Sequence, residues 1–393
     1  MLSTRLLRDH SDVVRDGLRR RGDAEALATL EAWLRLDGER RTLVAGSTEI
    51  EGVQARLTAI ETEMRALALL LPNLPDARTP EGTSPAQNVE IRRWGEVATP
   101  SLPARTHEQL AAMLGILDLP RATQLAGPRF PLLIGAGARL ARTLAALLLD
   151  LHRVNGYIEV APPHLLKAET LEGTGHLPWH KDALFAVERD HLYLSPTAEA
   201  QLVALHADET LPERILPLAY TACTPCFRRE AGSSGAAMRG LLRQRQFDKV
   251  ELVRITIPET ADAAFEILLA DAEHALQTLD LPYRVVSLCC GELPFASQRT
   301  VDLEVWLAGK ARYVEIASIS DCGTFQARRL KMRYQPHSGG RARYPSTLNG
   351  SALPIGRTIA ALLERGHQAD GGVRLPEALA RYFGDGALRP EEQ

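Results

Sequence analysis

The sequence predicts an α+β protein in which an antiparallel or mixed β-sheet flanked by helices follows an N-terminal antiparallel two-helix hairpin. Up to about residue 72 the apolar residues recur with helical spacing. From about residue 107, helical segments alternate with short β-rich runs that lack a regular β-α-β rhythm, which favours an antiparallel sheet. Apolar residues make up 45% and charged residues 24% of the 393, which is typical of a globular chain and excludes wholesale disorder.

The second helix of the hairpin carries a narrow apolar stripe. Spacings of 3 and 4 are the pattern of a heptad seam. The stripe consists of Ile50, Val53, Leu57, Ile60, Met64, Leu67 and Leu71. Thr48 followed by Glu51 is a capping-box pattern, so we expect this helix to begin at Thr48. Its polar outer face favours a projecting hairpin over a buried core element.

The first helix of the hairpin is marked by Leu27, Leu30 and Leu34 and is expected to end near Leu43. The segment 45–47, Ala-Gly-Ser, is the expected turn, and so short a connection makes the two helices antiparallel neighbours.

Prolines and glycines from Pro72 to about residue 90 predict a linker. We therefore divide the chain into an arm with its linker (1–105) and a larger domain (106–393), which the resemblance given below implies is catalytic. In the second part we expect helices at 108–117 and 137–152. The expected strands are Tyr157–Val160, His191–Leu194, Lys249–Thr256, Tyr283–Leu288, Thr300–Trp306 and Arg312–Ile316.

Charge and cysteine content exclude several classes of protein. The net charge of −3 excludes a global basic field for nucleic acid, although it leaves a local patch open. Five cysteines make no disulfide framework, and the lone C-x-x-C at Cys223 and Cys226 is a weak metal signal, so we expect no zinc. The longest apolar stretch, Leu144–Leu151, is too short to span a membrane, so we expect a cytoplasmic protein without a membrane partner.

The segment 226–251 predicts a nucleotide site. A β-run is expected to end in Arg228 and Glu230, and a second strand to carry Arg243, Phe247 and Glu251 on one face. Arginines clamp phosphates bidentately, an aromatic ring stacks on a purine, and carboxylates hold amino groups. Taken alone, the pattern is also compatible with a solvated sheet face.

These segments give the chain a resemblance to bacterial seryl-tRNA synthetases, which are class II aminoacyl-tRNA ligases. The likeness covers nearly the whole chain, and its motifs stand in the family's order. They are Asn155–Pro163, Gly173–Pro178, Leu194–Glu199, Cys226–Glu251, Glu315–Ser320, Phe325–Arg329, Thr347–Ser351, Gly356–Thr358, Asp370-Gly371 and Leu375-Pro376.

The resemblance implies a role for each matched residue. Arg228, Glu230, Arg243 and Arg357 would be catalytic. ATP would contact Arg228, Arg229, Glu230, Arg243, Phe247, Glu315, Ile316, Ala317, Ser318 and Arg357. L-Serine would contact Thr197, Ala198, Glu199, Arg228, Glu251, Asn349 and Ser351. Glu315 and Ser318 would hold Mg²⁺. The implied product is seryl-adenylate, and the implied assembly is a homodimer through 142–163, where 144–151 is either a contact face or ordinary core.

The chain departs from the family in two tRNA-facing places. Only about thirty residues separate Leu36–Arg41 from Leu71–Pro75, so the coiled-coil arm is roughly half the family's usual length and about 25 Å shorter. The expected tip, 44–48, carries no Lys or Arg. In the loop of the second motif the family's Gly-Arg-Asp-Thr-Arg-Gly reads Gly235-Ala-Ala-Met-Arg-Gly240.

These departures leave three hypotheses about the acceptor of the activated serine. The first is a paralogue that passes serine to a carrier protein or a small amine, and it stands slightly ahead. The second is a working serine--tRNA ligase that charges serine tRNA with a short arm. The third is a catalytically silent binding scaffold, which the intact ATP and serine residues disfavour.

Overall fold

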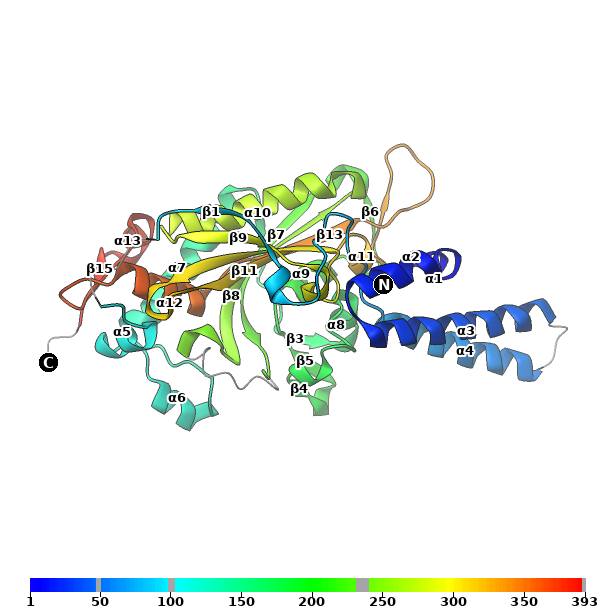
Figure 1. Ribbon diagram of the computed structural model, residues 1–393, viewed down its shortest axis with the longest axis horizontal. Helices are drawn as coiled ribbons and strands as arrows, with labels where there is room; N and C mark the ends of the chain where they lie inside the picture. Colours follow the sequence, from blue (N-terminus) through cyan, green and yellow to red (C-terminus); the bar gives the residue numbers. More distant parts are fainter. Residues whose placement is uncertain (47–50, 98–102, 231–239, 391–393) are drawn as a thin grey trace.

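The computed structural model describes residues 1–46, 51–97, 103–230 and 240–390. Two short helices, α1 (Thr4–Asp9) and α2 (Ser11–Arg20), precede the long helices α3 (Ala24–Gly46) and α4 (Glu51–Leu70). Figure 1 shows α3 and α4 side by side, extending away from the rest of the molecule. The predicted projecting hairpin is thus present.

The inner faces of the hairpin meet as the stripe predicts. Leu30 and Trp33 of α3 are buried in one cluster with Ile60 and Met64 of α4. The expected turn is partly wrong, because Ala45 and Gly46 continue α3. The expected helix start at Thr48 lies outside the described residues.

The main sheet confirms the α+β prediction. Among the described residues it has eight strands in the order β1-β9-β10-β11-β13-β8-β7-β2, antiparallel except for the parallel pair β2 and β7. Their bounds are β1 Val89–Trp94, β9 Tyr283–Ser287, β10 Arg299–Leu307, β11 Arg312–Asp321, β13 Ser346–Pro354, β8 Gln246–Thr256, β7 Leu218–Phe227 and β2 Ile158–Glu159.

Three long helices pack on one face of this sheet and form the main core. They are α7 (Ala136–Val154), α10 (Ala261–Thr278) and α12 (Ile355–Gly366). Their buried leucines contact Val250, Leu303 and Leu348 of the sheet. Leu144, Leu147 and Leu148 of α7 belong to this core, so these residues of the stretch 144–151 are core, while a subunit contact by the rest of the stretch stays a prediction.

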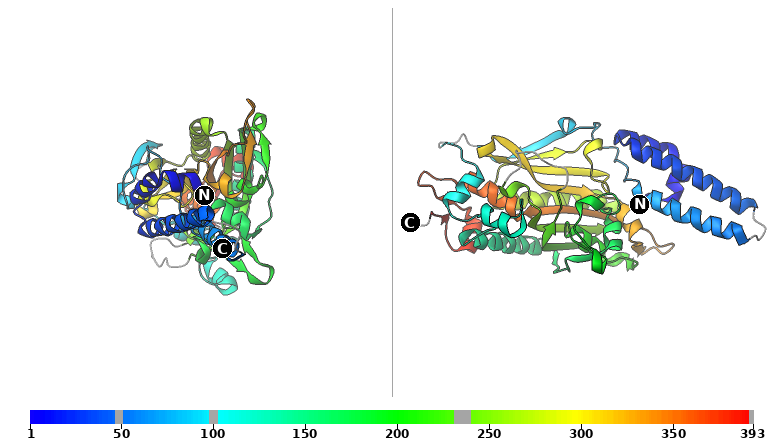
Figure 2. Two further views of the ribbon diagram at one scale, coloured as in Figure 1. Left: turned by 90° about the vertical axis from the view of Figure 1, so that its right-hand side faces the viewer. Right: turned by 90° about the horizontal axis from the view of Figure 1, so that it is seen from below.

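The opposite face carries shorter elements and stays partly open. It is covered by α8 (Ala168–Thr174), α9 (Glu199–Ala204), α11 (Phe325–Arg329) and a small sheet of β3 (Leu165–Lys167), β5 (Leu192–Leu194) and β4 (Ala186–Val187). Figure 2 shows the arm leaving the body beside these elements. The candidate site lies on this face.

The remaining elements lie at the periphery. They are α5 (His107–Met113), α6 (Leu119–Ala126), α13 (Glu377–Phe383), the pair β6 (Thr210–Pro212) and β12 (Arg333–Gln335), and the pair β14 (Val373–Arg374) and β15 (Ala387–Leu388). The helix expected at 108–117 ends earlier, at Met113. No helix in the described ranges is both long and apolar enough to cross a membrane.

Strand β1 falls within the range assigned to arm and linker, yet it pairs with β9 at the edge of the main sheet. The division at residue 105 stays a proposal about domain organisation.

Candidate active site

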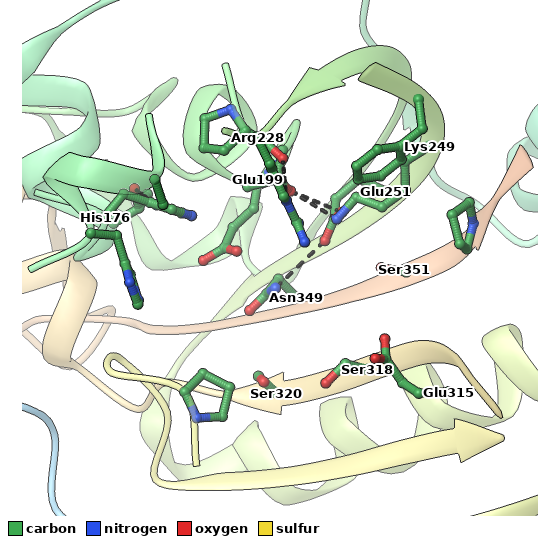
Figure 3. Close-up of a pocket in the computed structure, with 18 of the residues that line it drawn as sticks. His176, Glu199, Arg228, Lys249, Glu251, Glu315, Ser318, Ser320, Asn349 and Ser351 are labelled. Atoms are coloured by element: carbon green, nitrogen blue, oxygen red, sulfur yellow. Dashed lines mark hydrogen bonds and ion pairs between the residues drawn. The ribbon is translucent and has the colours of Figure 1, made fainter. Parts of the chain in front are cut away.

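A cavity of about 430 Å³ opens on the less covered face of the sheet. Its floor is made by three adjacent strands, β11, β13 and β8, and Arg228 stands directly after the end of the next strand, β7. In Figure 3 the side chains of Glu199, Arg228, Glu251 and Asn349 converge in this pocket. Segments far apart in the sequence therefore build one site.

Strand β8 supplies side chains at alternate positions. Phe247, Lys249 and Glu251 all line the cavity, because residues two apart on a strand share a face. The expectation that Arg243 lies on the same strand is wrong, since β8 begins only at Gln246. Arg243 instead follows the short helix η5 (Gly240–Leu242) and reaches the cavity from there.

Strand β11 contains a β-bulge that aims its polar residues. Leu303 of β10 pairs with Ala317, but Glu304 pairs with Glu315, so Ile316 is an extra residue on β11. Without the bulge, positions three apart would point to opposite faces of the sheet. The bulge lets Glu315 and Ser318 line the same cavity.

Glu251 is the centre of a buried polar network. Its carboxylate accepts a hydrogen bond from Thr197 Oγ1 at 3.1 Å and forms an ion pair with Lys249. Lys249 Nζ also donates to Thr197 Oγ1 at 2.9 Å, and Asn349 Nδ2 donates to Glu251 at 3.5 Å. The network fixes a carboxylate, a hydroxyl and an amide around one small space.

Glu199 is the second carboxylate of this space. Burial and the nearby charge of Glu251 raise the pKa of Glu199 to about 7. Gln326 Nε2 donates to Glu199 Oε1 at 2.7 Å and holds its orientation. Two carboxylates this close to Arg228 suit a small zwitterion that has an ammonium group and a carboxylate of its own.

Two arginine–carboxylate pairs mark the rest of the cavity. Arg243 pairs with Glu230, and Arg357 Nη1 lies 3.1 Å from Glu315 Oε1. Arg357 Nε also donates to the carbonyl of Leu242 at 3.0 Å. The Arg228 guanidinium lies 5.3 Å from the centre of the Phe247 ring. Cations and an aromatic face so arranged suit the phosphates and base of a nucleotide.

Glu230 itself sits in strained backbone, because its φ is 51° in a non-glycine residue. It follows β7 rather than ending it, since the strand stops at Phe227. The left-handed turn carries Glu230 to the cavity rim, where it meets Arg243.

Most of the residues expected from the sequence line this cavity, and three do not. Arg229 is exposed outside it, while Ala198 and Ala317 are fully buried. Those that line it are Thr197, Glu199, Arg228, Glu230, Arg243, Phe247, Glu251, Glu315, Ile316, Ser318, Asn349, Ser351 and Arg357.

Several polar residues of the cavity, among them Lys249 and His176, were not assigned a contact from the sequence. Lys249 lies between Phe247 and Glu251 on the same strand face, and the alternation that selected its neighbours could have found it. His176 also lines the cavity and contacts Thr174 Oγ1 through Nδ1 at 2.9 Å. Burial lowers the pKa of His176 to about 3, so its ring is neutral. It lies in the matched motif Gly173–Pro178, but the resemblance gave this residue no role of its own.

Glu315 and Ser318 are suited to a hard divalent cation. A carboxylate and a hydroxyl oxygen face the same cavity, and Mg²⁺ is commonly held by one or two carboxylates together with phosphate oxygens. The parts of the chain that the structure describes contain no cluster of three or more His, Cys, Asp or Glu with metal-binding geometry. The pair therefore fits an ion shared with a bound phosphate.

Known proteins match both the chain and its fold. Residues 185–366 match the model of the tRNA synthetase class II core domain (G, H, P, S and T). The chain is 42% identical to the serine--tRNA ligase of Synechococcus sp. (strain JA-3-3Ab), covering 99% of each protein. It is 47% identical to the serine--tRNA ligase of Sorangium cellulosum (strain So ce56), covering 94% of this chain and 88% of the relative.

A solved structure has the same fold as this chain. The crystal structure of seryl-tRNA synthetase from Pyrococcus horikoshii, complexed with ATP, superposes with a TM-score of 0.92 at 31% identity and covers 100% of both chains. Fold and site together define a class II aminoacyl-tRNA synthetase, so the predicted class of ATP-dependent ligase is confirmed. Within that class, the chain belongs to the serine--tRNA ligase family.

Proposed function

We propose that the protein activates L-serine with ATP and charges serine tRNA with the product. The relatives are named serine--tRNA ligases, and the Pyrococcus structure was solved with ATP. The observation that carries the proposal is the network of Glu251, Thr197 and Lys249 beside Glu199 and Arg228. It suits an amino acid with a hydroxyl side chain.

The serine pocket explains selection against close analogues. Ionised Glu199 and Glu251 would attract the serine ammonium group, and Thr197, Asn349 and Ser351 offer partners for its hydroxyl. Alanine would leave such buried polar groups without a partner, which costs about 1–3 kcal/mol for each group. Arg228 lines the same cavity, and its guanidinium lies 5.3 Å from the centre of the Phe247 ring, so it would hold the serine carboxylate against the nucleotide.

Activation is an in-line displacement at phosphorus. A serine carboxylate oxygen attacks the α-phosphorus of ATP, the bond to the β,γ-pyrophosphate breaks, and seryl-adenylate and pyrophosphate result. No general base is needed, because the carboxylate is already ionised at neutral pH. Arg228 would neutralise the α-phosphate, Arg243 and Arg357 the leaving pyrophosphate, and Phe247 with Glu230 would seat the adenine.

Glu315 and Ser318 would hold Mg²⁺ against the ATP phosphates, where the ion supplies positive charge. Arg357 already pairs with Glu315, so ATP binding would redistribute that contact toward phosphate. Among the described residues this is the site we assign to the metal.

In the second step a terminal hydroxyl of tRNA attacks the acyl carbonyl, serine becomes esterified to the tRNA, and AMP leaves. Of the three hypotheses left open by the sequence, the comparisons favour the second, a working serine--tRNA ligase, over transfer to a carrier protein or small amine. The loop 231–239, where the sequence departs from the family, lies outside the described residues.

One reaction with two readouts tests the proposal. Purified protein is incubated with ATP, Mg²⁺, labelled serine and total bacterial tRNA, and both pyrophosphate release and acid-precipitable label are followed. We expect both signals, and loss of both in Arg228→Ala. Pyrophosphate release without label on tRNA would restore the first hypothesis, and neither signal would favour the silent scaffold.

We further propose that the protein works as a homodimer in the cytoplasm. The outer edge of the short strand β2 is not paired within the described chain, and Ile158 on it is 56% exposed. Val154 at the end of α7 is 78% exposed nearby. A second copy would cover these apolar residues.

A further inference from the structure

The base of the helical arm is hydrogen-bonded to one wall of the active-site cavity. We call Arg21, Leu69 and Asn73 the arm foot and residues 293–297 the pocket wall. Pro294, Phe295, Ala296 and Ser297 of the wall line the cavity. The two segments lie more than 200 residues apart in sequence, so the contact is a product of the fold.

Arg21, which follows α2, binds backbone carbonyls with its whole guanidinium group. Nη1 donates to Leu293 at 3.1 Å, and Nη2 donates to Pro294 at 3.2 Å and Ser297 at 2.5 Å. Nε donates to Asn73 at 2.7 Å. A planar fork with several donors can fix a loop in a way that a lysine, with its single ammonium group, cannot.

Asn73, which follows α4, makes a second set of bonds to the same wall. Its backbone N–H donates to the carbonyl of Phe295 at 2.9 Å. Its side-chain Nδ2 donates to Ala296 at 2.9 Å and to Cys322 at 3.0 Å. Asn73 is only 8% exposed, so these bonds are shielded from water.

Arg329 of α11 ties the end of α4 to the next segment of the cavity. Nη2 donates to Leu69 at 2.9 Å, while Nη1 donates to Glu172 at 3.0 Å and Leu177 at 3.4 Å. Its guanidinium also lies 5.1 Å from the ring centre of Phe295. Leu177 is the neighbour of His176, which lines the cavity.

The arm foot also reaches a residue next to the serine pocket. Cys322, held by Asn73, places its thiol 3.9 Å from Asn349 Oδ1. Figure 3 shows His176 and Glu199 at one side of the pocket and Glu315 at the other. The residues assigned to ATP come from the segment after β7, from β8, from the segment after η5, from β11 and from α12. The hydrogen bonds of Arg21 and Asn73 in the described chain end on none of these residues.

We propose that the arm foot positions the serine side of the active site, so that the arm contributes to serine recognition in the activation step as well as to any contact with tRNA. Arg21 and Asn73 are positioning residues, since they act through the pocket wall. The inference rests on the proposed function and deepens it. It also gives the shortened arm a role that does not depend on the length of its outer part.

Serine-dependent exchange of pyrophosphate into ATP tests this, because that reaction needs no tRNA. The variants are Arg21→Lys, which keeps the charge and loses the fork, and Asn73→Ala, which removes two buried donors. For each we expect the KM for serine to rise about tenfold, the size that follows from losing buried hydrogen bonds. The KM for ATP should stay within about twofold.

The matched control is Arg56→Lys. Arg56 lies on α4 but away from the foot, and its Nε donates to Glu39 of α3 at 2.7 Å. It should leave both KM values unchanged. Thermal melting of each variant reports loss of fold separately, and Arg21→Lys provides the milder change if Asn73→Ala unfolds the protein.

Two results would overturn the inference. One is a wild-type serine KM in folded Arg21→Lys and Asn73→Ala proteins. The other is an equal rise of the KM values for serine and ATP, which would indicate general damage to the fold. A wild-type protein without serine-dependent exchange would contradict the proposed function itself and this inference with it.

Discussion

Glu199 changes its protonation state near neutral pH. Its pKa of about 7 is raised by burial and by Glu251, so much of the free enzyme carries a neutral Glu199 below pH 7. The serine ammonium group favours the ionised form. We therefore expect the KM for serine to fall as pH rises from about 6 to 8 and then to level off.

The measurement is the KM for serine in pyrophosphate exchange at a series of pH values. Glu199→Gln serves as the control, because a neutral amide cannot titrate. Its KM should be higher and flat across the same window, and a pH dependence that survives in Glu199→Gln would assign the titration to another group.

Lys249 offsets the charge of the two carboxylates. It forms an ion pair with Glu251 and donates to Thr197, and only 7% of it is exposed. Lys249→Met would keep the volume of the side chain and remove the ammonium group. We expect the KM for serine to rise by about tenfold or more, since hydrogen bonds to charged groups contribute about 1.5–3 kcal/mol.

Lys167→Met, on the exposed side of β3, is the control for loss of a lysine and should behave like the wild type. The measurement is again pyrophosphate exchange. An unchanged KM in Lys249→Met would remove Lys249 from the serine network.

Single residues of the site were predicted well where they lie in a motif to which the sequence assigned a role. Thr197, Arg228, Glu251 and Asn349 all line the cavity as expected. Ala198 and Ala317 do not line the cavity. They were included because a motif was assigned as a continuous segment, and some of its side chains are buried. His176 lies in the matched motif Gly173–Pro178 but received no role, because its contact with Thr174 depends on the turn after α8, whose C-cap Gly175 is left-handed.

Short elements decide where the arginines point. Helix η5 begins at Gly240, whose φ is +63°, and a Cβ placed there would lie 2.6 Å from His107 Nε2 and 2.7 Å from Glu108 Cγ. His107 Nε2 accepts from the N–H of Leu241 at 3.3 Å, and the carbonyl of Leu242 in turn accepts from Arg357.

Gly240→Ala should therefore move η5 away from α5 and loosen Arg357. We expect a loss of about 1–3 kcal/mol in the free energy of unfolding and a rise of several-fold in the KM for ATP. Chemical denaturation and pyrophosphate exchange measure the two effects.

Gly115→Ala separates backbone strain from the steric clash. Gly115 has nearly the same φ, +65°, but an added Cβ would meet nothing within 4 Å. It should lose some stability and keep the wild-type KM for ATP. If Gly240→Ala also keeps that KM, η5 does not control Arg357.

Elements whose apolar spacing repeats over several turns could be predicted from the sequence. Very short helices and a bulge within a strand could not. The stripe from Ile50 to Leu71 predicted α4 because the spacing repeats over several turns. The position of Arg243 was mispredicted because η5 stands between the loop and β8, and three residues leave no periodic signal. No pattern in the sequence predicted the bulge at Ile316 either, although it orients Glu315.

At the scale of the whole molecule, the arm joins the body rather than forming a separate unit. Ile60, Met64 and Leu71 of the arm share one buried cluster with Phe295 and Phe325 of the catalytic part. The alignment with the serine--tRNA ligase of Thermotoga petrophila runs over 422 positions, more than the 393 residues of this chain. That relative therefore has residues without a counterpart here.

The charge of the arm bears on how tRNA would be held. The two long helices carry Arg35, Arg40, Arg41, Arg56 and Arg65 against Glu25, Glu31, Asp37, Glu39, Glu51, Glu61 and Glu63. Three of these arginines form ion pairs with acids of the arm. Since phosphate binding needs surplus cations, we expect the two long helices by themselves to bind tRNA weakly.

Dimer formation is the last prediction at this scale. Strand β2 is the edge of the main sheet, and Val154 and Ile158 present apolar surface beside it. We expect wild-type protein to have twice the chain mass of 43.1 kDa in light scattering, and the double variant Val154→Asp, Ile158→Asp to have the monomer mass. The reason is that a buried contact would desolvate the new carboxylates without giving them a partner.

Ile91→Asp supplies the matched control, because Ile91 is 50% exposed on β1, the opposite edge of the same sheet. It should stay dimeric, which separates a general effect of new charge from an effect at the β2 edge. Circular dichroism confirms that each variant is folded. A monomeric wild type would contradict the dimer, and a double variant that stays dimeric would place the contact between subunits elsewhere. Either result would leave the active-site cavity as a property of the single chain.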